Sequence, residues 1–267
     1  MGSLNTDVVV RRGFDINRYL MTAGGIRPES FNWSDPGPPL EDDALFCLGY
    51  MMDIESHTII YLREMLNTAL AEDVSITAFL SCWAYEEFFH SLVLRRFLEV
   101  HGVAVDDRRF AQLRRRRPAD YLAQRLGRAL SRLSRHFPAI HMTWGAINEL
   151  STLTGYQALI KRAGNPLLCK VLSRIIKDER RHFSFYFNQA QTRLKPRAAQ
   201  LLTAAIVRNF WTPVGGAVRG DADIRRVCTY LFADEDGTKR LALIDARIAR
   251  LPGFGWFDLA ARFCRGT

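Results

Sequence analysis

The pattern of hydrophobic and polar positions is helical along nearly all of the chain beyond residue 40. Apolar residues recur three or four positions apart, and prolines and glycines interrupt this repeat at intervals. The pattern predicts helices over residues 41–70, 74–101, 119–135, 139–163, 166–193, 197–210, 221–232 and 238–250. Because long helices joined by short connections pack as antiparallel neighbours, we expect an all-α helix bundle.

Proline and glycine are concentrated before the first of these helices, so we expect residues 1–40 to form an irregular N-terminal arm. The remainder, residues 41–267, has neither an internal repeat nor a low-complexity segment and is interpreted as a single helical domain. Within it we expect a bundle at about 41–193, accessory helices at about 197–250, and an aromatic tail, 251–267, that packs back on the bundle.

Composition bears on the compartment. Nearly half of the 267 residues are hydrophobic (48%), enough for a sizeable core. The N-terminus lacks the basic start and apolar run of a secretory signal, and no stretch approaches the roughly 20 apolar residues that span a bilayer. The five cysteines are widely spread without C-x-x-C spacing, which predicts free, buried thiols. We therefore expect a soluble, cytoplasmic protein with no membrane contact.

Two of the predicted helices each carry a Glu-x-x-His motif, formed by Glu87 with His90 and by Glu179 with His182. Residues three positions apart share a helix face, so each pair can bind the same metal ion. Carboxylate and imidazole ligands suit iron or manganese better than a metal that prefers thiolates. One such motif arises easily by chance, whereas two in separate long helices indicate a metal site.

The hairpin geometry supplies the two further carboxylates that a four-helix di-metal site needs. In an antiparallel hairpin, residues equally far from the turn lie at the same height. Glu149 and Glu179 are equally far from Gly164, and Glu55 and Glu87 are equally far from position 71, each next to a predicted turn. Both carboxylate pairs are therefore expected to lie level with each other.

These acidic residues stand among apolar neighbours, where an uncompensated carboxylate costs several kcal/mol. Two divalent ions would remove that cost. Asp53 and Glu64 stay open as alternatives to Glu55, and Glu86, about 100° around the helix from Glu87, is interpreted as a group beside the ligands or on the surface. The predicted metal ligands are Glu55, Glu87, His90, Glu149, Glu179 and His182.

Three of these segments resemble those of a known family. Trp-x-x-Glu-Glu-x-x-His at residues 83–90, Asp-Glu-Arg-Arg-His at 178–182 and Glu-Leu-Ser-Thr at 149–152 are similar to the motifs of soluble acyl-acyl-carrier-protein desaturases. The resemblance implies a ferritin-like four-helix bundle with a di-metal core, to which this chain adds C-terminal helices. It also implies that Trp83 and Asp178 form a route for electrons or hydrogen bonds, and that Thr152 assists oxygen activation.

The resemblance further implies two iron ions that activate oxygen for attack on an unactivated C–H bond, with a mixed manganese–iron pair left open. The expected reaction is desaturation of a fatty acyl chain carried on acyl carrier protein or coenzyme A, in a homodimer. Electrons would come from a separate donor such as a ferredoxin, because the chain has no flavin or iron–sulfur motif. The alternatives are a hydroxylase or N-oxygenase of another small substrate, a tRNA hydroxylase, and an iron-storage protein.

The net charge of +9 favours an acidic partner, such as a carrier protein, a coenzyme A phosphate or nucleic acid. The alternative is a solvated basic face. The aromatic residues Phe88, Phe89, Phe183, Tyr156 and Tyr186 line a substrate pocket in one interpretation and form ordinary core in the other. Much of the positive charge comes from Arg108, Arg109, Arg114, Arg115, Arg116, Arg117, Arg125, Arg128, Arg132 and Arg135.

Overall fold

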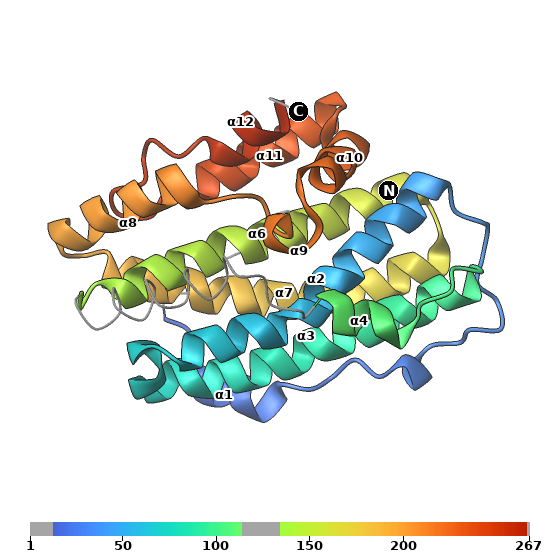
Figure 1. The fold of residues 1–267 in the computed structure, drawn as a ribbon, viewed down its shortest axis with the longest axis horizontal. Helices are drawn as coiled ribbons and strands as arrows, with labels where there is room; N and C mark the ends of the chain where they lie inside the picture. The colour runs from blue at the N-terminus through green and yellow to red at the C-terminus, as the bar shows by residue number, and fades with distance from the viewer. Residues whose placement is uncertain (1–12, 114–133, 266–267) are drawn as a thin grey trace.

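The computed structural model describes residues 13–113 and 134–265, and every regular element within those ranges is a helix. Four long helices form two hairpins, α2 with α3 and α6 with α7, and α3 also packs against α7 (Figure 1). The predicted helix at 119–135 falls almost entirely outside the described residues. The long helices are α2 (Asp42–Leu66), α3 (Val74–Val100), α6 (Phe137–Ala163) and α7 (Pro166–Arg193).

The turns that set the height of each hairpin have clear local causes. Asp73 caps α3 by accepting a hydrogen bond from the Ile76 backbone N–H at 3.1 Å. Between α6 and α7, Gly164 takes the left-handed conformation (φ 59°) that ends a helix. Asn165 then caps α7 by accepting from the Leu168 N–H at 2.9 Å. These caps confirm the two turns predicted from the sequence.

A second layer of shorter helices lies along α6, on the side away from α3 (Figure 1). The aromatic tail packs back on this layer, since Phe254 is fully buried and Phe257 nearly so. Asp245 fixes the last helix by accepting hydrogen bonds from the backbone N–H groups of Ala260 and Ala261, both at 2.9 Å. The layer comprises α8 (Arg197–Phe210), α9 (Gly216–Arg219), α10 (Asp221–Phe232), α11 (Glu235–Ile248) and α12 (Leu259–Arg265).

Several predicted boundaries were wrong. The described part of the N-terminal arm is not irregular throughout, because tertiary contacts of Tyr19 hold a short helix there. The first long helix ends at Leu66 rather than at 70, and a separate 3₁₀ turn follows it. α11 begins at Glu235, three residues before its predicted start. The unpredicted elements are α1 (Ile16–Thr22), η1 (Pro28–Ser30), η2 (Ala69–Glu72), α4 (Asp107–Leu113), α9 and α12.

The five cysteines all lie within the described ranges and form no disulfide, as expected, but they are not all buried. Cys169 is exposed, and Cys82 and Cys264 are half-buried. Among the described helices, none combines the length and the apolar character needed to cross a bilayer.

Candidate metal centre

The six predicted ligands converge at one buried point between the two hairpins. On one side, His90 Nδ1 lies 3.2 Å from Glu179 Oε1, 3.6 Å from Glu55 Oε2 and 3.9 Å from Glu87 Oε1. Ligand atoms of these four residues all lie within 4.8 Å of one another, close enough to hold a single metal ion. The four side chains come from α2, α3 and α7.

A second group of four lies beside the first. His182 Nδ1 is 3.0 Å from Glu87 Oε1, 3.6 Å from Glu149 Oε2 and 3.8 Å from Glu179 Oε2. These atoms also fit within 4.8 Å of one another. Glu87 and Glu179 belong to both groups, so the arrangement offers two adjacent sites with two shared carboxylates.

Several buried polar atoms at this point have no hydrogen-bond partner, which bears on whether a cation fits there. A buried polar atom normally has a hydrogen-bond partner, and an orphaned one costs about 1–3 kcal/mol. Five such atoms converge on this point, and every one belongs to a predicted ligand. Two divalent cations would satisfy all of them, so the residues present fit the group that the motifs imply. The orphaned atoms are Glu55 Oε2, Glu87 Oε1, His90 Nδ1, Glu179 Oε1 and His182 Nδ1.

The pKa values of the ligand glutamates also favour a cation at this point. Burial raises the pKa of Glu87 well above its ordinary value, and the charges of Glu55 and Glu179 raise it further. Burial also raises the pKa of Glu149 to about 8. At Glu179 burial acts upward too, but hydrogen bonds from His182 and His90 outweigh it and lower the pKa. Without a cation the site would hold protons, so a metal ion binds in competition with them.

An outer pair of acids holds the two histidines in a reciprocal arrangement. His90 Nε2 lies 3.2 Å from Asp178 on α7, and His182 Nε2 lies 2.9 Å from Glu86 on α3. Each acid directly precedes a ligand glutamate and contacts the histidine of the opposite helix. Such partners fix the ring orientation of a metal-binding histidine and leave its other nitrogen for the metal.

Glu86 is fully buried, so of its two predicted positions the one beside the ligands is confirmed and the one on the surface was wrong. Its carboxylate accepts hydrogen bonds from the Tyr19 hydroxyl at 2.7 Å, the Gly24 backbone at 3.0 Å and Arg181 at 2.6 Å. Burial alone would raise its pKa, but His182, with Tyr19 and Arg181, holds the pKa at about 2. Arg181 also binds Asp178 at 2.6 Å and so links the two outer acids.

Two aromatic residues contact ligand carboxylates directly. Trp83 donates from its indole nitrogen to Glu149 at 2.9 Å, while Asp178 contacts His90, so the two residues implied as one route reach different ligands. Tyr156 donates its hydroxyl to Glu55. No local pattern in the sequence predicts this last contact, which joins residues 101 positions apart.

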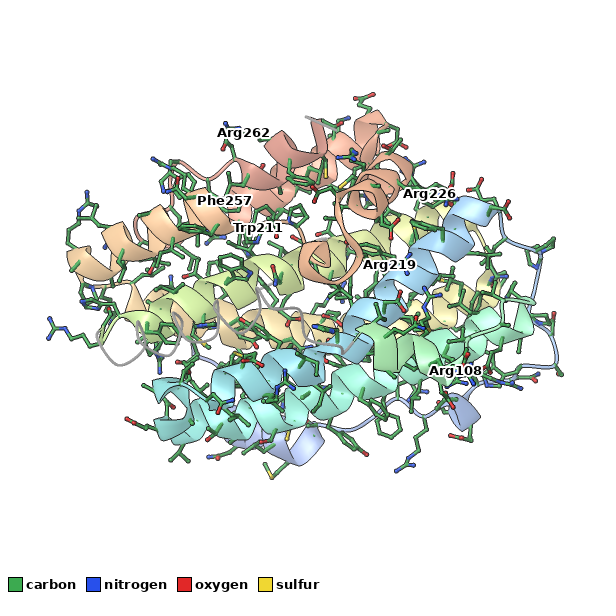
Figure 2. All side chains as sticks on the ribbon, viewed as in Figure 1. Arg108, Trp211, Arg219, Arg226, Phe257 and Arg262 are labelled. Carbon is green, nitrogen blue, oxygen red and sulfur yellow. The ribbon has the colours of Figure 1, made fainter. Side chains whose placement is uncertain are left out.

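The alternatives to Glu55 lie outside both groups of four. Asp53 is fully buried, but it binds Arg109 through two hydrogen bonds of 2.7 Å and also contacts Arg219 of α9 (Figure 2). Glu64 is half-buried and binds Arg63 at 2.8 Å. The guanidinium of Arg109, whose side chain is 35% exposed, is thus paired with a buried carboxylate.

Of the remaining arginines in the basic segment, only those at its two ends lie within the described residues. Arg108 is exposed on α4 (Figure 2). Arg114 to Arg117, and the arginines at 125, 128 and 132, lie outside the described residues.

A chamber of about 570 Å³ lies next to the centre. Its volume falls within the range of roughly 300–1,000 Å³ that is usual for small-molecule binding sites. The ligands Glu55, Glu87, Glu149 and Glu179 form part of its wall, and Thr152 lies one turn beyond Glu149 on the same face of α6. Of the five aromatic residues proposed to line a substrate pocket, Tyr186 lies in the wall of this chamber. Phe88, Phe89, Phe183 and Tyr156 are not among its lining residues, and Phe88 is exposed instead.

Neither a family model nor a curated protein matches this chain. The evidence on its function therefore comes from the geometry of the site.

Proposed function

We propose that this chain is a ferritin-like di-iron oxidoreductase that uses oxygen to attack an unactivated C–H bond. The observation that carries the proposal is the pair of overlapping four-residue groups, whose orphaned atoms all face one point. Two glutamates and two Glu-x-x-His pairs from four helices are the ligand set of di-iron carboxylate proteins. Bound there, two ferrous ions would supply the electrons and Lewis acidity that make oxygen reactive.

The chain's own residues have separate parts in this proposal. Glu87 and Glu179, which belong to both groups, would help to hold both ions, with Glu55 and His90 completing one site and Glu149 and His182 the other. Each site then gains one further contact from the protein. Trp83 holds Glu149 in place and Tyr156 holds Glu55, so neither terminal carboxylate is free to rotate away.

The chamber defines where a substrate would lie. Its wall contains apolar side chains such as Ile54, Ile140 and Ile206 beside four ligand glutamates, so a hydrocarbon group can approach the centre with little water present. The finer proposal is desaturation of an acyl chain carried on acyl carrier protein or coenzyme A. Hydroxylation is the alternative, because both reactions begin by removing hydrogen from the same kind of bond.

Oxygen consumption by iron-loaded protein, combined with mass spectrometry of products from acyl thioester libraries, tests the proposal. We expect substrate-dependent consumption and a product two mass units lighter for desaturation or sixteen heavier for hydroxylation. Thr152→Val keeps the side-chain shape and removes the hydroxyl, so iron content should stay while hydrogen peroxide is released. No oxygen consumption by fully iron-loaded protein with any substrate would contradict an oxidase.

A further inference from the structure

Two cysteines of the C-terminal layer lie in direct contact with each other. Cys228 belongs to α10 and Cys264 to α12, two helices that pack against each other in this layer (Figure 1). Their Sγ atoms are 2.7 Å apart, although the two residues are 36 positions apart in the sequence. All five cysteines lie within the described ranges, and no other two of them are in contact. The fold therefore brings one pair of thiols together outside the candidate metal centre.

Asp245 fixes the position of Cys264. Its carboxylate, on α11, accepts hydrogen bonds from the backbone N–H groups of Ala260 and Ala261 in the first turn of α12, both at 2.9 Å. Cys264 follows Ala260 by four residues, about one helical turn, and so lies on the same face of α12. The anchored turn thus holds this thiol beside α10.

Cys228 is held from the other side by the packing of α10. Ile224 and Leu231, about one turn before and after it, are both buried and share its face of the helix. Because both thiols are already held in place, a bond between them orders little further chain. Groups held in contact in this way react as if at very high concentration. A bond between these two sulfurs is therefore favoured over a bond from either sulfur to a separate molecule.

The two thiols differ in their access to solvent. Cys264 is half-buried whereas Cys228 is buried, so a reagent reaches Cys264 first. The hydrogen bond with Cys228 raises the pKa of Cys264, and burial raises it further. Because the thiolate is the reactive form, we expect the pair to exchange slowly, over hours rather than seconds.

We propose that Cys228 and Cys264 form a reversible disulfide that ties α12 to α10, with a low-molecular-weight disulfide such as oxidised glutathione as the oxidant. In the first step the Cys264 thiolate attacks one sulfur of the oxidant. The S–S bond of the oxidant breaks, and one thiol leaves with the proton that Cys264 gave up. The Cys228 sulfur then attacks Cys264 in this mixed disulfide and expels the second thiol. The protein loses two hydrogens with their electrons and the oxidant gains them, so an excess of thiol reverses the reaction.

The disulfide would secure the wall of a cavity beside the candidate metal centre. Both cysteines line a cavity of about 90 Å³ whose wall also contains the predicted ligand Glu55. Detachment of α12 would open that cavity toward solvent, so a bond that retains α12 keeps water from this side of the centre. The bond also closes a loop of 36 positions, and a disulfide stabilises a fold mainly by restricting the unfolded chain.

Peptide mapping of the purified full-length protein tests the bond itself. The protein is equilibrated with reduced and oxidised glutathione in equal amounts, quenched with acid, alkylated, and digested without reductant. We expect mass spectrometry to find the peptides of Cys228 and Cys264 joined in most molecules, two hydrogens lighter than the separate thiols. Excess dithiothreitol should release both peptides. Alkylation of both residues, glutathione on both, or a cross-link between two chains would overturn the proposal.

Thermal unfolding compares the oxidised and reduced protein, with Cys169 as the matched control because it is exposed on α7. Oxidation should raise the Tm of the wild type by about 4–16 °C, the scale of one disulfide in a chain of this size. The same shift should occur in Cys169→Ser and vanish in both Cys228→Ser and Cys264→Ser. An unchanged Tm in the oxidised wild type, or a shift that persists in both variants of the pair, contradicts the proposal.

Hydrogen exchange tests whether the bond ties α12 down. The amides of Ala260 and Ala261 exchange when α12 detaches from Asp245, so we expect them to exchange at least about tenfold more slowly in the oxidised protein. The amide of Leu20 in the short helix α1 should keep its rate. Equal rates at Ala260 and Ala261 in the two forms would overturn the tie. None of these measurements depends on iron, so their outcome is separate from that of the proposed oxidase.

Discussion

Asp53 and Glu55 lie two residues apart on α2 and are both buried, yet the protein surrounds them differently. Asp53 is held by the guanidinium groups of Arg109 and Arg219. Glu55 faces His90 and two other glutamates, and one of its oxygens has no hydrogen-bond partner. Two residues correspond to about 200° around a helix, so the two carboxylates face opposite sides. The protein neutralises Asp53 with its own arginines, whereas the cluster around Glu55 leaves buried polar atoms without a partner and could hold a metal cation.

Removal of a bound metal should have the largest effect on the stability of the fold. If the cation compensates the cluster, a metal at about a thousandfold excess over its Kd stabilises the fold by about 4 kcal/mol. Removing it with a chelator should lower Tm by about 8–16 °C, by the usual scaling for chains of this size. Differential scanning calorimetry measures the change, and manganese or ferrous iron added back should restore it. An unchanged Tm would mean that the cluster needs no cation.

Removing the acid of the other site should affect stability alone. Asp53→Asn leaves Arg109 partly buried without a carboxylate and leaves Arg219 with Asp223 alone, which costs about 3 kcal/mol in the free energy of unfolding. Iron content should not change. Asp43→Asn is the matched control, because Asp43 and Arg226 form an exposed ion pair worth about 1 kcal/mol or less. Loss of iron in Asp53→Asn would show that the two acids are not independent.

The outer acids should tune metal affinity. Glu86→Gln keeps the shape and weakens the partner of His182, so we expect iron to bind about 10–100-fold more weakly. Metal titration against a competing chelator measures the Kd, and Glu235→Gln at an exposed position is the control. Wild-type affinity in Glu86→Gln would reduce Glu86 to a packing role.

The sequence predicted the ligand cluster because its determinants are local. Helical spacing places each Glu-x-x-His pair on one face, and the capped turns at Asp73 and Gly164 set the height of Glu55 and Glu149. The burial argument could not by itself distinguish Glu55 from Asp53, because both lie among apolar neighbours. That choice depends on Arg109 and Arg219, which are brought to α2 by tertiary structure from positions far along the chain.

The outer contacts were less predictable, although one had a signal. Glu86 and Asp178 both directly precede a ligand glutamate, and this repetition could have marked Glu86 as the equivalent of Asp178. No local sequence pattern predicts the contacts of Tyr19 and Tyr156 with the site. Tyr19 lies on a seven-residue helix that is too short to be stable alone and is held by contacts with α3, including its bond to Glu86.

His141 is a third case: it is a half-buried imidazole in the chamber wall, and the loss of water around it lowers its pKa. Its folded-state pKa of about 4 is below the ordinary value of about 6.5, so the unfolded chain binds the proton first as pH falls. The stability it contributes is complete above about pH 6.5 and is lost toward pH 4. Urea unfolding at pH 7.5 and 4.5 should show wild type losing about 2–3 kcal/mol more than His141→Gln. Equal losses would mean that water reaches the imidazole freely.

Elemental analysis of the purified protein measures directly whether the buried cluster holds metal. Because Glu87 and Glu179 complete two adjacent sites, we expect close to two iron ions per chain after anaerobic loading with ferrous iron. Most of that metal should be lost in Glu149→Ala and in His182→Ala, whereas Glu235→Ala should keep it. A wild-type protein that binds no iron, or two ligand variants that both retain two ions, would contradict this expectation.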